Sequence, residues 1–74
     1  MTLLEAPFRS QLRVLSLTGL SEEARMVLLQ LGVEPGEALE KMHVAPLGDP
    51  LTIRIGEQLF TLRKEVCGLI EVES

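Results

Sequence analysis

The sequence has little of what catalysis and large binding sites require. Its 74 residues contain one cysteine, one histidine, no tryptophan and no tyrosine. A single cysteine excludes an internal disulfide, and the only aromatic residues are Phe8 and Phe60. The core must therefore consist of leucine, valine and isoleucine, in one domain over residues 1–74. A chain of this length buries only about 60% of its unfolded surface, so its core is too small to enclose a large substrate or an organic cofactor.

Clustered positive charge is also missing. The chain has seven lysines and arginines and eleven acidic residues, which gives a formal net charge of −4. Arg63-Lys64 is the one pair of adjacent basic residues. Nucleic acid and anionic membrane surfaces are therefore poor partners. No apolar run approaches the ~20 residues that span a bilayer, and the first seven residues lack the features of a secretory signal. These absences predict a cytoplasmic protein with no direct membrane insertion.

One helix is expected early in the chain, over residues 22–31. Ser21 is placed as its N-cap, with acidic residues in the first turn, where the helix dipole favours them. Gly32 suits the left-handed position that ends a helix, and Val33 suits the hydrophobic contact that follows. The apolar residues with helical spacing, which predict its buried face, are Ala24, Val27, Leu28 and Leu31.

About five short strands surround this helix in the sequence. They are expected over residues 12–17, 38–45, 51–55, 58–62 and 70–73, with a turn or single helical turn over residues 63–68. Glu34 to Glu37 suits a type II turn, because Pro35 and Gly36 occupy its two central positions. Lys41 and His43 share the parity of Leu39, which predicts a bulge or a barrel end open to solvent.

The pattern indicates a mainly β fold. Strands this short leave exposed edges unless the sheet curls and closes. A small SH3-like β-barrel of about five short strands with one inserted α-helix solves that problem. The alternative is an open α+β sheet covered on one face by the helix.

A stiff corner separates the second and third strands. Pro46 and Pro50 each fix φ and remove a backbone donor, Gly48 supplies backbone freedom, and Asp49 can accept a bond from nearby main chain. A rigid corner that projects Leu47 makes a pre-organised contact, because little entropy is lost on docking. It also serves to set the strand register, and the two roles are compatible.

Three segments resemble the FeoA family. Residues 28–36, LLQLGVEPG, are similar to the family signature L-x-x-L-G-h-x-P-G, where h is hydrophobic. Residues 45–51, APLGDPL, are similar to its A-P-L-G-D-P corner, and the closing segment is similar through Leu62-Arg63-Lys64, Cys67, Ile70 and Val72. The resemblance runs over residues 12–73, and the three motifs in this order are specific.

That resemblance implies an SH3-like domain and a function in ferrous iron uptake. It implies a cytosolic accessory protein that binds the cytosolic region of the FeoB-type GTPase-permease and modulates its assembly or activity. The same domain type occurs at the C-terminus of iron-dependent repressors, so a stand-alone metal-sensing or regulatory domain is the alternative. The sequence lacks the helix-turn-helix region of such a repressor, which favours the accessory protein.

Catalytic and metal sites are not predicted. The serines lack a G-x-S-x-G context, and there is no phosphate-binding P-loop, so no enzymatic activity is expected. His43 and Cys67 are the candidate ligands of the metal-sensor alternative. We expect His43 to be solvated and Cys67 to be buried as a small hydrophobe, with no metal ligand and no cofactor.

The predicted partner-binding residues fall on two elements. Met26 and Leu29 lie opposite the expected buried face of the helix and form a candidate hydrophobic contact strip. The corner contributes Leu47, Gly48, Asp49 and Pro50. A weak homo-oligomer formed through the helix strip is the alternative use of that surface.

Overall fold

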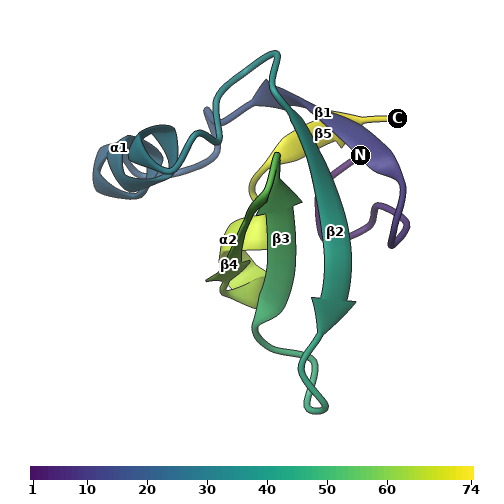
Figure 1. The fold of residues 1–74 in the computed structure, drawn as a ribbon. Coiled ribbons are helices and arrows are strands. Elements are labelled where there is room, and N and C mark those ends of the chain that lie inside the picture. Colours follow the sequence, from purple (N-terminus) through teal and green to yellow (C-terminus); the bar gives the residue numbers. More distant parts are fainter.

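Five antiparallel strands form one sheet in the computed structural model, which describes residues 1–74 (Figure 1). The strands lie in the order β4-β3-β2-β1-β5. Two helices, α1 (Glu22–Gln30) and α2 (Lys64–Cys67), interrupt the strand sequence. The strands are β1 (Gln11–Ser16), β2 (Ala38–Val44), β3 (Leu51–Ile55), β4 (Gln58–Leu62) and β5 (Glu71–Glu73).

The predicted mainly β class and the five strands are confirmed, but the closed barrel is wrong. β4 and β5 are the two edges of the sheet and do not pair with each other. The first residues of the chain occupy the outer side of β5 instead: Val72 N–H donates to the Met1 carbonyl at 2.8 Å, and Thr2 bridges Glu71. Because this edge of β5 is taken, β4 has no strand there to join.

The N-terminal segment is also part of the core. Leu3 and Ala6 are buried, and Leu3 N–H donates to the Ile70 carbonyl at 2.9 Å. They join a single hydrophobic cluster made almost entirely of aliphatic side chains. Its other members are Leu12, Val14, Leu17, Leu20, Leu28, Val33, Leu39, Leu51, Ile53, Leu62, Cys67, Ile70 and Val72.

Local turn chemistry follows the sequence closely. Ser21 accepts from Ala24 N–H at the start of α1, as a capping serine should. Gly32 has φ of 92°, and Val33 N–H donates to the Leu28 carbonyl at 2.9 Å, which is the bond pattern of a Schellman stop. The type II turn is confirmed as well, since Glu37 N–H donates to the Glu34 carbonyl at 3.0 Å.

The predicted buried face of α1 is only partly correct. Leu28 is buried and Ala24 packs against the core, but Val27 is 53% exposed and Leu31 is 40% exposed. Figure 1 shows α1 beside the sheet rather than over it. Residues near both chain ends, including Leu3 and Ile70, already fill the core, so α1 is attached by one turn and its outer side faces solvent.

A bulge lies in β2, which is one of the two outcomes that the parity of its residues predicted. Lys41 pairs with Ile53 and His43 pairs with Thr52, so Met42 is the extra residue. Leu39 and Lys41, which precede the bulge, both face the interior, whereas His43 is exposed. The bulge therefore turns the end of β2 toward solvent before the corner begins.

The Schellman stop gives a test of how firmly α1 ends. Gly32→Ala places a Cβ at a left-handed φ and is expected to lower the free energy of unfolding by about 1 kcal/mol, although no atom lies within 4 Å of that Cβ. Gly68→Ala is the matched control, because Gly68 has φ of −69° and is expected to be neutral or slightly stabilising. Urea unfolding measures both variants, and equal effects would contradict a strain at Gly32.

Candidate functional site

The corner between β2 and β3 is a tight, internally bonded loop. Gly48 N–H donates to the Ala45 carbonyl at 2.8 Å, and Ala45 N–H donates to the Pro50 carbonyl at 3.0 Å. Gly48 has φ of 91°, which a residue with a side chain rarely adopts. The loop extends beyond the sheet (Figure 1), and Leu47 at its tip is 98% exposed. The sequence therefore places a leucine on a pre-shaped projection.

Asp49 accepts a hydrogen bond from one particular backbone group, whereas the sequence predicted only a bond from nearby main chain. Its Oδ1 accepts from Lys64 N–H at 2.8 Å, across the gap between the corner and the start of α2. Arg63, the N-cap residue of α2, makes no side-chain capping bond. Asp49 therefore caps α2 from a distant part of the chain and fixes the base of the corner.

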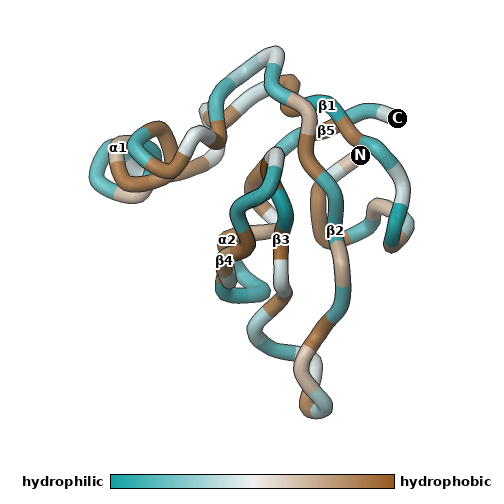
Figure 2. The backbone as a smooth tube through the Cα atoms, viewed as in Figure 1, coloured by the Kyte–Doolittle hydropathy of each residue, from teal (hydrophilic) through white to brown (hydrophobic).

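The other predicted surface is the outer side of α1. Met26 is 52% exposed, and Leu29 is also exposed. Val27 and Leu31 are exposed as well, but at helical spacing they lie on the side that carries Ala24 and Leu28, away from Met26 and Leu29. Figure 2 shows hydrophobic segments along α1 although it stands away from the sheet. We call Met26 and Leu29 the α1 strip.

A shallow groove adjoins the α1 strip. It has a volume of about 370 Å³ and lies between the end of β1, α1 and the turn at Pro35. Leu15 and Leu29 face it from β1 and α1, and both are exposed. The corner projects from a different end of the molecule (Figure 1), so the structure does not combine the two predicted surfaces into one site.

Lys41 is a feature that sequence reasoning did not resolve. Its side chain is 2% exposed, and its Nζ donates to the carbonyls of Leu3 at 3.1 Å and Leu4 at 2.9 Å. The ammonium also lies 4.5 Å from the centre of the Phe8 ring. Burial lowers the pKa of Lys41, and the nearby Cys67 opposes that shift. The inward parity of Lys41 with Leu39 was the signal in the sequence.

The two candidate metal ligands are in different environments. Cys67 is fully buried on α2, as predicted, and burial raises the pKa of its thiol to about 11. His43 is exposed at the end of β2. No group of three or more His, Cys, Asp or Glu side chains is arranged to hold a metal ion. Neither helix has the length and apolar character needed to cross a membrane.

Comparison with known proteins gives consistent matches over the chain. The family model described as the FeoA domain matches residues 1–74. The solution structure of iron(II) transport protein A from Clostridium thermocellum is 41% identical, with a TM-score of 0.89 over 99% of this chain and 44% of that one. FeoA from Chlorobium tepidum is 30% identical, with a TM-score of 0.90 over 97% of this chain and 68% of that one.

A third structure connects the fold to a described function. FeoA from Stenotrophomonas maltophilia, solved with zinc, is 29% identical, with a TM-score of 0.82 over 99% of this chain and 89% of that one. It is described as a prokaryotic SH3 domain protein and a candidate bacterial ferrous iron transport activating factor. The described fold agrees with the SH3-like prediction. The chain spans less than half the length of the Clostridium protein.

Two buried groups are expected to give opposite pH dependences of stability. Between pH 9 and 11 the folded protein keeps the Cys67 proton that the unfolded chain loses, so this thiol lowers stability as pH rises. The slope approaches about 1.4 kcal/mol per pH unit. Lys41 has the opposite effect. Its pKa is lower in the folded protein than in the unfolded chain, so as pH rises the folded protein releases this proton at a lower pH. The free energy of unfolding therefore rises with pH up to the ordinary lysine pKa of 10.5.

Urea unfolding of two single variants separates these contributions. Lys41→Met is expected to lose stability more steeply above pH 9 than the wild type, because only the Cys67 effect remains. In Cys67→Ala, the free energy of unfolding is expected not to decline at alkaline pH. Asp49 also contributes to the raised pKa of Cys67, so Asp49→Asn is the control for that charge. Parallel pH profiles for all four proteins would contradict the assignment.

The capping role of Asp49 is testable on its own. Asp49→Ala removes the acceptor for Lys64 N–H and is expected to destabilise the protein by about 1 kcal/mol. Asp49→Asn keeps a side-chain oxygen and is expected to retain most of that stability. Hydrogen exchange at the Lys64 amide is the direct measurement: it speeds up in the alanine variant, and unchanged exchange would refute the cap.

Proposed function

Because this chain belongs to the FeoA family, we propose that it is a non-enzymatic accessory protein of ferrous iron transport. The resemblance of its three motifs to this family is confirmed by the match over residues 1–74. The proposed partner is the cytosolic region of the FeoB-type GTPase-permease. The description of the Stenotrophomonas protein as a candidate transport activating factor supports this assignment.

The observation that carries the proposal is the exposure of apolar side chains on rigid supports. Leu47 lies almost wholly in solvent on a corner held by two backbone bonds and by Asp49. Met26 and Leu29 lie on a helix with a cap at each end. Pre-ordered apolar side chains lose little entropy on docking, which makes them effective contacts for another protein.

The mechanism that fits such a module is selective binding. A bound module changes the activity of a transporter only if it binds one conformational state of that transporter more tightly than another. The GTP-bound and GDP-bound states of a FeoB-type permease are the two states in question. The module would favour one of them and so change the rate of the transport cycle or the assembly of the transporter.

Metal sensing is the weaker candidate. It requires His43 and Cys67 to act together, but one is exposed on β2 and the other is sealed in the core. The raised pKa of Cys67 disfavours the thiolate that binds metal.

A binding measurement with the full FeoB-type transporter in nanodiscs tests the proposal. Leu47→Ser and the double variant Met26→Ser/Leu29→Ser each remove exposed apolar contacts, so we expect at least one of them to weaken binding about tenfold or more. Leu59→Ser is the matched control, because Leu59 is an exposed leucine on the edge strand β4. Isothermal titration calorimetry gives the affinities. Absence of wild-type binding in every nucleotide state of the transporter would contradict the proposed function.

A further inference from the structure

The helix α1 carries more apolar surface than the chain itself uses. Only Leu28 of this helix is buried, while the α1 strip of Met26 and Leu29 faces solvent, and Val27 and Leu31 are exposed on the side of Leu28. Apolar side chains on the outer side of a surface helix are normally replaced by polar ones. The exposed Met26 and Leu29 therefore favour a second, intermolecular contact of α1.

The groove beside α1 has firm walls. The turn that carries Pro35 is bonded to β1 in both directions: Gly36 N–H donates to the Val14 carbonyl at 2.8 Å, and Val14 N–H donates to the Glu37 carbonyl at 2.9 Å. Arg13 adds a bond from its Nη1 to the Gly36 carbonyl at 2.8 Å. These bonds hold the turn against β1, so the groove keeps its shape without a ligand.

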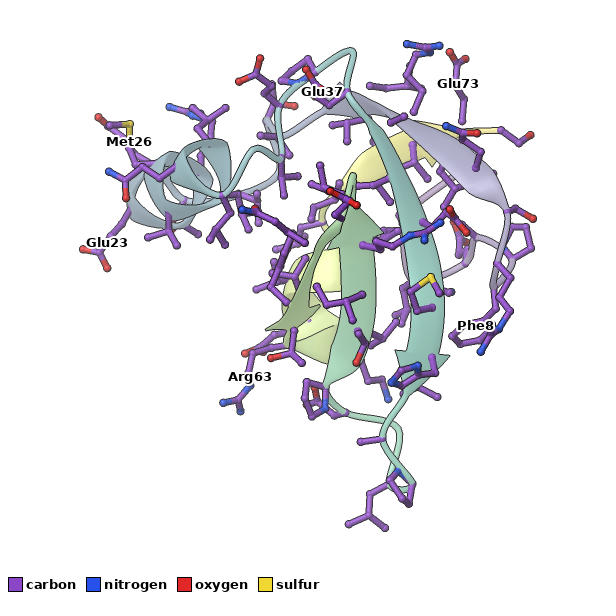
Figure 3. The ribbon with its side chains drawn as sticks, viewed as in Figure 1. Phe8, Glu23, Met26, Glu37, Arg63 and Glu73 are labelled. Atoms are coloured by element: carbon purple, nitrogen blue, oxygen red, sulfur yellow. The ribbon has the colours of Figure 1, made fainter.

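Negative charge surrounds this surface. The segment from residue 17 to residue 37 contains four carboxylates, which lie around the groove, and one guanidinium, Arg25, which is the only charged residue in the groove lining itself. None of the four is in an ion pair, and all are exposed: Glu22, Glu23, Glu34 and Glu37. Figure 3 shows Met26 and Glu23 projecting above and below the outer end of α1, and Glu37 on the turn before β2. Arg13, bonded to the Gly36 carbonyl, is a second guanidinium beside the turn, so four carboxylates against two guanidiniums leave a net negative charge around this surface.

We propose that this groove and the α1 strip bind an amphipathic helix of the partner, with lysine or arginine on both sides of its apolar stripe. The inference deepens the proposed function and rests on it. Strand addition has little free edge here, because β5 pairs with β1 as far as Ser16 on one side and the Pro35 turn is bonded to Val14 on the other. Side-chain docking remains, and a helix supplies apolar residues at the spacing that a groove accepts.

Charge distinguishes this occupant from two others. A second copy docked through the same surface would bring the four carboxylates toward four more across a two-fold axis, which is repulsive. An anionic membrane would meet the same carboxylates, whereas interfacial helices carry basic residues on their polar side. A basic helix gains attraction from the same charges that repel the other two.

A designed probe tests the chemistry of the surface directly. The probe is a helical peptide of about 14 residues, or four turns, made of leucine and lysine, and its partner probe has glutamate in place of lysine. Nuclear magnetic resonance titration of the full chain is expected to show shifts at Leu15, Leu29 and Pro35 with the lysine peptide. The glutamate peptide is expected to bind at least about tenfold more weakly.

Variants separate the apolar and electrostatic parts. Leu29→Ser is expected to weaken binding of the lysine peptide about tenfold, and Leu59→Ser is its control. The double charge reversal Glu34→Lys/Glu37→Lys is expected to weaken binding similarly and to reduce its dependence on salt. Glu5→Lys/Glu65→Lys changes the net charge equally, on the N-terminal segment and on α2, and is expected to have a smaller effect.

The outcomes separate this inference from the proposed function. If the transporter in nanodiscs binds the chain, and binding is lost with Leu47→Ser but not with Leu29→Ser, docking is at the corner and the inference fails while the function stands. If the lysine peptide occupies the groove but the transporter does not bind, the function fails and the surface chemistry stands. Equal binding of the two peptides, lysine-peptide shifts away from the groove, dimerisation through Leu29, or adsorption to anionic vesicles would overturn the inference.

Discussion

The capture of the N-terminal segment is the interaction on which the rest of the structure depends. Leu3 enters the core, its carbonyl accepts from Lys41 Nζ, and Met1 takes the outer edge of β5 through Val72 N–H. An edge that is occupied cannot pair with β4, so the sheet stays open. Because Leu3 fills part of the core, only one residue of α1, Leu28, is buried there. The open sheet and the exposed helix thus have one cause.

The N-terminal segment also explains why Lys41 can be buried. A buried ammonium without a carboxylate partner is expensive unless its donors are satisfied. Here the carbonyls of Leu3 and Leu4 satisfy two of them, and the face of Phe8 supplies further attraction. The N-terminal segment therefore makes the burial of Lys41 tolerable, and Lys41 in turn fixes the path of that segment. Each depends on the other, which ties the first residues of the chain to the middle of β2.

The local features of this fold could be predicted from the sequence. Which of several distant segments would fill the core could not. The N-cap at Ser21, the stop at Gly32 and the bulge after Lys41 depend on neighbouring residues, and each was predicted. The spacing of Val27 and Leu31 with Leu28 defines one side of a helix correctly, but periodicity does not say which segment will cover that side. Leu3 belongs to a short segment without periodicity, so its entry into the core had no sequence signal. The same limit explains the site: Met26 and Leu29 were predicted, whereas the groove needs the fold to bring Leu15 beside α1.

Rigidity decides how such a module can act. An isolated helix of nine residues is marginal in water, yet α1 has a serine cap, a Schellman stop and an anchor at Leu28. The corner has its own internal bonds and the link from Asp49 to α2. Both apolar surfaces are therefore held in one conformation before any partner arrives. A rigid surface recognises shape and charge at low entropic cost, so the conformational change that such binding reports must lie in the partner. In the function that we propose, the effect of the module rests on which state of the partner presents a complementary helix.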